Sequence, residues 1–347
     1  MSGVSKAIVQ PLLNWYDAGH RDLPWRSEPA PYRVWVSEIM LQQTRVEAVR
    51  GYFSRWMNAL PDIPALAAAD EAVYTKLWEG LGYYSRVRNL HRAAVLLCEE
   101  YGGELPADYD RLLALPGVGE YTAGAVASIA FGLPVPAVDG NVLRVAARLD
   151  NDFTPITDAK FKKQTRERFA ALMPSDRPGD LNQSLMELGA TVCLPNGAPR
   201  CGDCPIQHLC EGFHRGNAAV LPLRAAKKAR RVENRTVLVV RCGQLVGLRQ
   251  RPKKGLLAGL WELPSLDGHL SPDELRAALT EMGWSVRKLL SLRPAKHIFT
   301  HVEWHMNGVY VELDAPAPAL TFVTPAELRD AYALPSAFRS FVSVLED

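Results

Sequence analysis

The sequence contains no uninterrupted apolar run long enough to span a bilayer, and its first residues lack the pattern of a secretory signal peptide. It also lacks a strong excess of charge of either sign, because the formal net charge over 347 residues is only +2 at pH 7. So small a charge does not by itself indicate a nucleic-acid partner, and local basic patches must supply that evidence. We therefore expect no membrane contact and a location in the cytoplasm, or in the nucleus or an organelle if the source is eukaryotic.

Cysteine is also scarce, and the few cysteines are concentrated in one part of the chain. Only six cysteines occur, and four of them fall in the loop CLPNGAPRCGDCPIQHLC, residues 193–210. A reducing compartment disfavours disulfides, so metal ligation is a better interpretation than disulfides or free core thiols. Zinc usually takes two separated C-x-x-C pairs, whereas iron–sulfur clusters take cysteines bunched in one loop. The spacing C-x7-C-x2-C-x5-C favours a [4Fe–4S] cluster, although spacing alone leaves zinc open. The predicted ligands are Cys193, Cys201, Cys204 and Cys210.

The length suggests two domains, since a domain has about 150 residues. Residues 1–216 are predicted to be mainly helical, because short segments with apolar residues at helical spacing alternate with turn signals. The clearest predicted helices are residues 34–50, 86–101, 121–131 and 141–149. Residues 217–233 are basic and poor in core-forming side chains, which indicates a solvated linker or, alternatively, the charged face of a short helix.

Residues 234–347 have a different pattern. Residues 236–251 are predicted to form a β-hairpin, with branched apolar residues on both sides of a turn at Cys242-Gly243-Gln244. A helix is predicted over 271–283 with Ser271 as its N-cap, and residues 301–313 are strand-like. The fold class is therefore a mainly α N-terminal region followed by a small α+β domain.

The stretch LALPGVGEYTAGAVASIAFG, residues 113–132, places Gly117, Val118 and Gly119 between the end of one helix and the start of another. Backbone N–H groups left uncovered by glycine at a helix N-terminus form an anion site suited to a phosphate. The alternative is a tight turn in which glycine is needed only for its dihedral angles. L-P-G-V-G followed by a helix of small residues is typical of a helix–hairpin–helix DNA-binding element.

Two carboxylates are candidates for catalysis. Asp139 stands where the N-cap of the helix 141–149 belongs, so capping is its simplest role. Glu38 lies in WVSEIMLQQT among apolar neighbours, so it is either on a thin polar stripe or partly buried. Partial burial would raise its pKa and let it hold a proton near neutral pH. If they meet in space, the two would resemble a glycosidase pair of one protonated acid and one ionised carboxylate.

Residues 80–94, GLGYYSRVRNLHRAA, interleave aromatic and basic side chains. Tyr83 and Tyr84 could fill a gap in a base stack while Arg86 and Arg88 hold phosphates. An ordinary basic helix face with core tyrosines is the alternative.

Together these residues closely resemble the A/G-specific adenine DNA glycosylases, the MutY family within the endonuclease III superfamily. The order is LPWR, SEIMLQQT, GLGYYSRVRNL, LPGVGEYTAGA, VDGNV, a four-cysteine loop and a C-terminal α+β domain. The resemblance implies a helical catalytic domain over 1–216 with a helix–hairpin–helix and a [4Fe–4S] loop at 193–210, a basic linker over 217–233, and a Nudix-like domain over 234–347. The family's first cysteine gap is usually one residue shorter, a difference that the Gly-Ala-Pro loop should absorb.

The resemblance also implies residue roles. The partner would be double-stranded DNA with adenine opposite 8-oxoguanine or guanine, the adenine being flipped into a pocket. Glu38 matches the general acid that protonates adenine at N7, Asp139 the carboxylate that stabilises the sugar cation, and Asn141 a residue that holds this site. Trp25, Arg26, Leu41 and Glu187 match the lining of the adenine pocket, and Gln43 and Tyr83 match residues that wedge into the stack.

The residue at position 121 decides the reaction type. Lyase members of the superfamily carry a lysine there, which forms a Schiff base with the sugar and cuts the strand. Tyr121 cannot do this, so the resemblance implies a monofunctional glycosylase that leaves an intact abasic site.

The C-terminal part is similar to a Nudix domain but has lost acidic residues of its signature. In 276–284 only Glu281 remains, with Ala277 and Thr280 at acidic positions, so a hydrolase metal site is not expected. The family uses this domain to recognise 8-oxoguanine, and Phe299-Thr300-His301 matches its Phe-Ser-His loop.

Three alternative functions compete with this prediction. They are a thymine or uracil mismatch glycosylase, a non-catalytic iron–sulfur DNA-binding protein, and a nucleotide pyrophosphatase, which the depleted signature argues against. We expect a monomer, with Cys98 and Cys242 as core residues.

Overall fold

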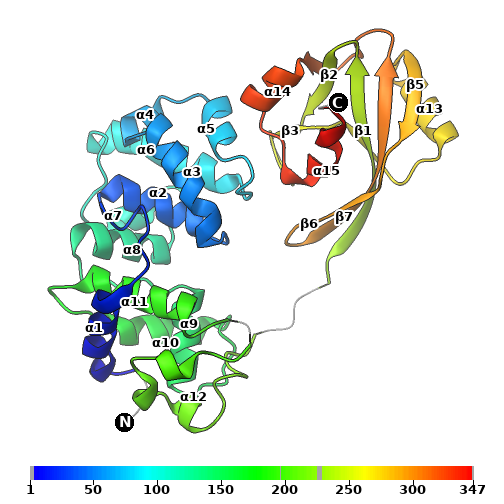
Figure 1. Ribbon diagram of the computed structural model, residues 1–347. Coiled ribbons are helices and arrows are strands. Elements are labelled where there is room, and N and C mark those ends of the chain that lie inside the picture. The colour runs from blue at the N-terminus through cyan, green and yellow to red at the C-terminus, as the bar shows by residue number, and fades with distance from the viewer. Residues whose placement is uncertain (1–3, 196, 225–228, 346–347) are drawn as a thin grey trace. The chain divides into compact units, whose positions relative to one another are not determined.

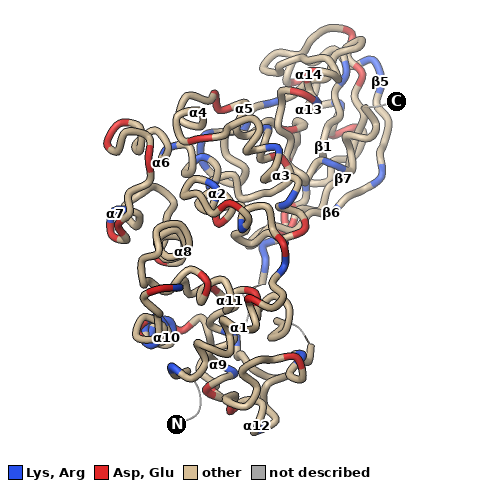
Figure 2. Tube along the Cα trace, turned by 60° about the vertical axis from the view of Figure 1, so that its left-hand side comes forward, with Lys and Arg blue, Asp and Glu red and all other residues tan. Residues whose placement is uncertain are grey.

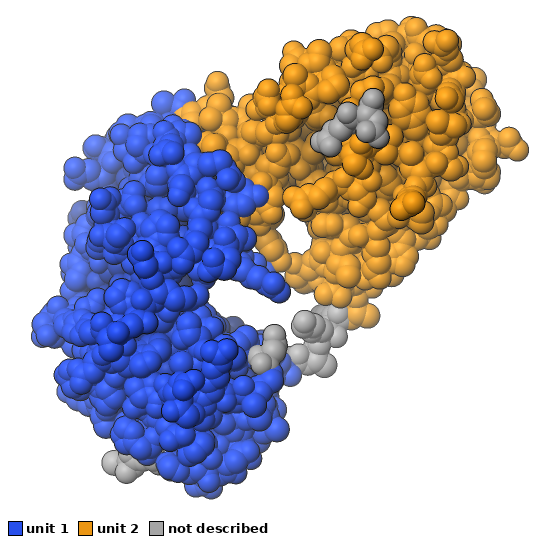
Figure 3. Space-filling view, in the orientation of Figure 1, with its two compact units in different colours: residues 1–68, 88–226 blue, residues 69–87, 227–347 orange. Residues whose placement is uncertain are grey.

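The computed structural model describes residues 4–195, 197–224 and 229–345. They fall into two compact units, residues 1–68 with 88–226 and residues 69–87 with 227–347 (Figures 1 and 3). One of the points where the chain passes between the units, after residue 87, lies inside the helix α6 (Ser85–Tyr101). In the described part of the chain, no helix combines the length and the apolar character needed to cross a membrane.

The first unit is built from helices. Besides most of α6, its α-helices are α1 (Val9–Gly19), α2 (Pro31–Leu41), α3 (Val46–Ala59), α4 (Ile63–Ala67), α7 (Tyr109–Ala114), α8 (Glu120–Phe131), α9 (Gly140–Leu149), α10 (Ala159–Ala170), α11 (Pro178–Thr191) and α12 (Glu211–His214). Four of these helices begin at an aspartate whose carboxylate accepts an N–H bond of the first turn. These caps are Asp62, Asp108, Asp139 and Asp158. Basic residues cluster on α10 (Figure 2).

The predicted single helix over 34–50 is wrong. The segment forms α2 and α3, separated by a turn in which Gln43 has a φ of 58°. That left-handed conformation is costly for a residue with a side chain, and it ends the helix although the apolar spacing continues. The helices predicted at 86–101, 121–131 and 141–149 are confirmed as α6, α8 and α9.

Small residues in α8 allow close packing at the centre of the first unit. α8 packs against α2, α7 and α11, and its buried positions include Ala123, Ala125 and Ala127. A Cβ atom built on Gly124 would lie 2.4 Å from the carbonyl oxygen of Pro136. The segment that leads to Asp139 therefore runs directly against α8.

The second unit is a mixed sheet with helices on both faces. Its strands are β1 (Arg231–Cys242), β2 (Leu245–Gln250), β3 (Trp261–Glu262), β4 (Ser265–Asp267), β5 (Val286–Ser291), β6 (Ala295–Ile298), β7 (Val302–Leu313) and β8 (Thr321–Val323). Its α-helices are α5 (Glu71–Leu77), α13 (Pro272–Glu281), α14 (Pro325–Ala331) and α15 (Arg339–Val342). The sheet has eight strands, and β1 pairs in parallel with β7 (Figure 1).

Successive side chains of β1 point to opposite faces of the sheet and contribute to the two hydrophobic cores of this unit. Val237 and Val239 face one cluster, which contains Phe338 near the chain's C-terminal helices. Leu238 and Val240 face the other cluster with side chains of α13. The predicted hairpin and the Ser271 cap are confirmed, the latter as a capping box with Glu274, and the predicted strand over 301–313 is β7.

Both ends of the segment predicted as a linker, residues 217–233, are joined to the two units. Leu221 is buried, and its carbonyl oxygen accepts a hydrogen bond of 2.9 Å from Arg148 Nε. At the other end, Arg231 already belongs to β1. Residues 225–228 lie outside the described residues.

Two helix-interior glycines give a test of the packing around α8. Gly124→Ala should lower the free energy of unfolding by about 1 to 3 kcal/mol, because the new methyl group overlaps the Pro136 carbonyl. Gly51→Ala in α3 should raise it by about 0.5 to 1 kcal/mol, because there only the Arg55 guanidinium lies near, at 3.4 Å. Urea unfolding of both variants measures the difference, and a stabilising Gly124→Ala would contradict the packing.

Candidate active site

A cavity of about 520 Å³ lies within the first unit. Its walls come from α2, α8, α11, the start of α9 and the loops that precede them. Eight of the residues singled out from the sequence line it, namely Trp25, Arg26, Glu38, Leu41, Gln43, Tyr121, Asp139 and Asn141. Its volume is ordinary for a small-molecule site.

Glu38 is the buried acid of this cavity. Its side chain comes from α2, is 5% exposed, and accepts a hydrogen bond of 2.5 Å at Oε2 from the Tyr121 hydroxyl. Burial raises the pKa of Glu38 from 4.5 to about 7, and the Tyr121 hydrogen bond limits that rise. Burial also raises the pKa of Tyr121 well above its ordinary value, so Tyr121 remains a donor. Of the two alternatives for Glu38, a polar stripe or burial, the structure shows burial.

Asp139 lines the same cavity in a different environment. As the N-cap of α9, its Oδ1 accepts N–H bonds from Asn141 at 2.9 Å and Val142 at 2.8 Å. Its Oδ2 accepts a bond of 2.7 Å from Asn141 Nδ2, and Arg144 Nη2 donates to Asn141 Oδ1 at 2.8 Å. Burial raises the pKa of Asp139, and these donors oppose the rise. Capping and a place at the cavity are therefore compatible roles.

Glu187 supports the cavity from behind. It is 2% exposed and is not part of the lining, but it binds Arg21 Nε at 2.7 Å and Arg26 Nη2 at 2.8 Å. Burial by itself would raise the pKa of Glu187, but the hydrogen bond from Arg21 and the charge of Arg26 hold it below the usual range. The carboxylate thus fixes two cations that do line the wall.

The hairpin between α7 and α8 has the turn expected from its glycines. Gly117 has a φ of 76°, and a Cβ atom there would lie 2.5 Å from Cβ of Asn89. Gly119 is the N-cap of α8, whereas Val118 is buried and its N–H donates to the Leu115 carbonyl oxygen at 3.1 Å. The Val118 amide is therefore engaged within the turn.

In the second unit, the turn before α6 presents Tyr83. Tyr83 has a φ of 47° and is 47% exposed, as suits a side chain that protrudes. Arg86 is buried, and its Nη2 donates to the carbonyl oxygens of Leu81 at 3.0 Å and Gly82 at 3.1 Å. The predicted phosphate contact by Arg86 is therefore corrected, because this guanidinium holds the turn together. Arg88 is partly exposed.

The segment Phe299-Thr300-His301 forms the turn between β6 and β7. Phe299 packs inward, while Thr300 and His301 are exposed. The Thr300 hydroxyl lies 2.7 Å from the Tyr83 hydroxyl.

The four clustered cysteines line one small cavity beside Arg148. Arg148 Nη1 lies 3.1 Å from Cys193 Sγ, and Cys210 Sγ lies 3.3 Å from the Arg148 carbonyl oxygen. Four cysteine side chains lining one space, with a cation at its edge, suit a group that takes sulfur ligands and carries negative charge from them. Among the described residues, no three His, Cys, Asp or Glu side chains are arranged to hold a single metal ion.

Sequence reasoning missed several residues of the cavity. Arg21 and Gln42 line the cavity but were not predicted to do so. Gln42 Nε2 donates to Thr122 Oγ1 at 3.2 Å. Met186 lines the cavity with its sulfur 3.7 Å from the Tyr121 hydroxyl. Of these missed residues, only Arg21 could have been found from the sequence, because it is a charged residue beside the apolar motif in RDLPW.

Comparison with known proteins agrees with this architecture. Residues 36–172 match the family described as HhH-GPD superfamily base excision DNA repair protein, and residues 236–344 match the NUDIX domain. The adenine DNA glycosylase of Mus musculus is 38% identical over 401 aligned residues, which cover 97% of this chain and 77% of the mouse protein. The chain belongs to the adenine DNA glycosylase family. The resemblance inferred from the motifs and the predicted fold class are thus confirmed.

Other relatives support the assignment to this family. The adenine DNA glycosylase of Mycolicibacterium smegmatis is 42% identical over 235 residues, covering 66% of this chain and 79% of that protein. Among solved structures, a thermostable thymine-DNA glycosylase has a TM-score of 0.54 at 27% identity, covering 60% of this chain and 96% of that one. The helical unit of the family therefore shares its fold with enzymes of another base preference.

The raised pKa of Glu38 makes a prediction about stability. Between pH 4.5 and about 7 the folded chain binds the Glu38 proton more tightly than the unfolded chain does. The protonated Glu38 therefore contributes to the stability of the fold at low pH, and this contribution is lost as the pH rises through about 7. Glu38→Gln has no such loss. Its free energy of unfolding should exceed that of the wild type by about 1 to 3 kcal/mol above pH 7, and the excess should shrink towards pH 4.5.

Urea unfolding at several pH values measures this difference. Glu28→Gln is the matched control, because the Glu28 side chain is 76% exposed, and it should give a flat difference. A Glu38→Gln curve parallel to the wild type across this range would show that Glu38 is ionised in the folded chain.

Proposed function

We propose that this chain is a monofunctional adenine DNA glycosylase that hydrolyses the N-glycosidic bond of adenine mispaired with 8-oxoguanine or guanine. The observation that carries the proposal is the buried Glu38, bonded to Tyr121 in a cavity that Asp139 also lines. A carboxyl group with a pKa of about 7 can act as a general acid at neutral pH. Base excision in DNA needs such an acid, because adenine is a poor leaving group as an anion.

The proposed reaction begins with adenine flipped out of the duplex into the cavity. Glu38 donates its proton to N7, and the bond between C1′ and N9 breaks with its electron pair going to the purine. The cation left on the sugar is stabilised by the carboxylate of Asp139. Water then adds at C1′ and gives up a proton, which leaves an intact abasic site.

Other residues hold this pair in place. Asn141, itself bonded to Arg144, orients the Asp139 carboxylate, and Glu187 fixes Arg21 and Arg26 in the wall with Trp25 and Leu41 beside them. For the DNA we assign the hairpin of Gly117 to Gly119 and Arg88 to the backbone. Gln43 and Tyr83, which both have a left-handed backbone conformation, are assigned to the base stack. Residues Phe299 to His301 are assigned to the base opposite adenine.

The Tyr121 hydroxyl supports a reaction without strand cleavage. A lyase needs an amine at the sugar to form an imine, and a phenol that donates to Glu38 offers none. We also propose that the chain acts as a monomer in the cytoplasm, with residues 1–216 for catalysis and 234–347 for recognition on either side of the segment 217–233.

We propose further that Cys193, Cys201, Cys204 and Cys210 hold a [4Fe–4S] cluster. Their common cavity and the neighbouring Arg148 support this ligand set. When bound, the cluster would fold residues 193–210 and take no part in bond breaking. Arg148 would balance its charge while also holding the Leu221 carbonyl.

A second candidate activity is excision of thymine opposite guanine, which the similarity to a thymine-DNA glycosylase raises. Four duplexes distinguish the two: adenine opposite 8-oxoguanine, adenine opposite guanine, thymine opposite guanine, and adenine opposite thymine. We expect cleavage of the adenine strand in the first two only, and only after alkali. Cleavage of the thymine strand would move the assignment to the other branch, and borohydride-trapped protein on DNA would refute the monofunctional reaction.

Changing single cysteines tests the cluster. Cys204→Ala should lose iron, inorganic sulfide and the visible absorbance of a cluster together, whereas Cys98→Ala should keep all three because Cys98 lies outside the cysteine cavity. Cys193→Ala with unchanged iron content would remove this residue from the ligand set. Bound zinc without sulfide would replace the cluster by a zinc site.

A further inference from the structure

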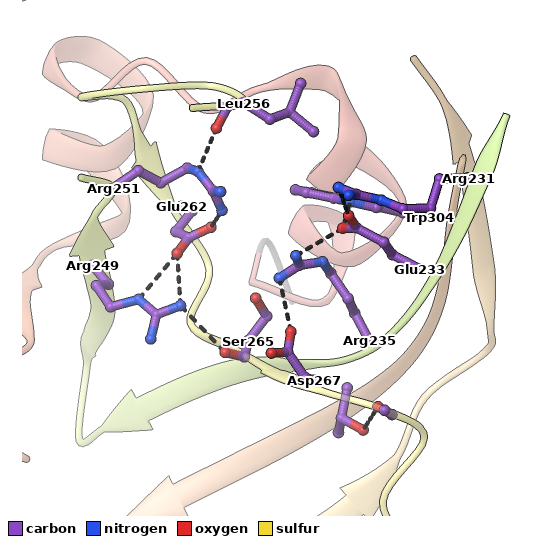
Figure 4. A network of polar contacts seen from close by, with 12 residues as sticks. Arg231, Glu233, Arg235, Arg249, Arg251, Leu256, Glu262, Ser265, Asp267 and Trp304 are labelled. Carbon is purple, nitrogen blue, oxygen red and sulfur yellow. Dashed lines mark hydrogen bonds and ion pairs between the residues drawn. The ribbon is translucent and has the colours of Figure 1, made fainter. Parts of the chain in front are cut away.

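A group of charged side chains surrounds Trp304 in the second unit (Figure 4), and the loop Phe299-Thr300-His301 packs against this residue through Phe299. At its centre lies Trp304 of β7, whose side chain is fully buried. The rings of Trp304 and Phe299 meet edge to face, with centroids 4.9 Å apart and planes at 72°. Phe299 is therefore the part of the loop that is anchored in the core.

Trp304 is itself held by charges. Its Nε1 donates to Glu233 Oε2 at 2.9 Å, and Arg235 Nη2 donates to the same oxygen at 2.9 Å. The guanidinium carbon of Arg235 lies 4.5 Å from the ring centroid and that of Arg251 lies 5.6 Å from it. A cation over an aromatic face attracts the ring, and more strongly where water is excluded. The orientation of this indole is thus fixed by one acceptor, the Glu233 carboxylate, and by two cations, Arg235 and Arg251.

A second carboxylate completes the arrangement. Glu262 is 1% exposed and binds Arg251 Nη1 at 2.5 Å and Arg249 Nη2 at 2.7 Å. Arg251 therefore reaches Trp304 from an ion pair that is itself buried, whereas Arg249 binds Glu262 and the Ser265 carbonyl oxygen without contacting the indole. Both arginines thus bind Glu262, and Arg251 is the one whose guanidinium also lies over the Trp304 ring.

The backbone of the loop is tied to the same strands. Phe299 N–H donates to the Val302 carbonyl oxygen at 2.8 Å, and Arg231 N–H donates to that of His301 at 3.1 Å. Arg230 Nε donates to the Phe299 carbonyl oxygen at 3.0 Å. Thr300 and His301 are left exposed between these ties.

We propose that Arg235 and Trp304 are positioning residues for recognition of the base opposite adenine. Arg235 fixes Trp304, Trp304 fixes Phe299, and Phe299 sets where the Thr300 hydroxyl and the His301 side chain stand. Neither Arg235 nor Trp304 needs to touch DNA. This inference rests on the proposed function, in which residues 299–301 contact 8-oxoguanine.

The test compares excision of adenine opposite 8-oxoguanine with excision opposite guanine, as single-turnover rates and as duplex affinities. Thr300→Ala is the reference and should lower the preference for 8-oxoguanine. Arg235→Met should lower it by about three- to tenfold, the loss expected when one hydrogen bond to the ligand is misplaced, with the guanine duplex unaffected. Arg235→Lys should recover most of the preference, because it restores a cation beside Glu233 and the indole.

Arg249→Met is the matched control, because it breaks an ion pair with Glu262 but leaves Trp304 in place, and it should keep the preference. Trp304→Phe keeps a ring against Phe299 but loses the bond to Glu233, so it should behave like Arg235→Met. Amide hydrogen exchange reports on the loop itself, and Arg235→Met should speed exchange at Phe299 more than in β1.

The outcomes separate the two proposals. If Thr300→Ala leaves the preference unchanged, the recognition role of the loop fails. If Thr300→Ala lowers the preference while Arg235→Met does not, the positioning role fails and the recognition role stands. An equal loss on both duplexes, or an equal loss in Arg249→Met, would show a general effect on folding and overturn the positioning role.

Discussion

The hydrogen bond between Tyr121 and Glu38 is the interaction around which the helical unit is arranged. An ionised carboxylate deprived of water is strongly disfavoured, so a carboxyl group with this burial keeps its proton to a pH of about 7. Keeping water out requires apolar neighbours, and Trp35, Ile39 and Met40 of the same helix are buried. It also requires α2 and α8 to lie close together, which the alanines and Gly124 of α8 permit.

Asp139, the second carboxyl group on the cavity, is also buried but has a different set of hydrogen-bond partners. Its oxygens accept three bonds from the start of α9, and donors of this kind favour the ionised form. Glu38 has one phenol as its donor and no helix terminus. In the proposed reaction, one acid that keeps its proton and one carboxylate surrounded by donors, on one cavity, would serve the departure of a protonated base. The fold separates the two by placing one within a helix and the other at a helix start.

Local features of the sequence predicted local features of the structure. The Asp139 cap, the small-residue helix α8 and the hairpin after residue 236 each depend on neighbouring residues, and each could be predicted. The break at Gln43 could not, because a left-handed φ in a residue other than glycine has no sequence signal. Arg86 was predicted to be a surface cation, yet it is buried and donates to the carbonyl oxygens of Leu81 and Gly82, in the turn just before its own helix. The Glu187 pair with Arg21 spans 166 positions, beyond any periodic pattern.

The charges of the second unit show what a Nudix-like domain can do without the signature acids. Metal-dependent hydrolysis needs carboxylates whose oxygens are open to a cation. Glu262 instead is buried with its two oxygens bound to Arg249 and Arg251, and Glu233 binds Arg235 and the Trp304 indole. Breaking a pair of the buried Glu262 would leave an uncompensated charge, so its contacts with the two arginines resist rearrangement. These acidic side chains are therefore bound by arginines and an indole, and in the proposed function they would hold the recognition loop at a fixed position.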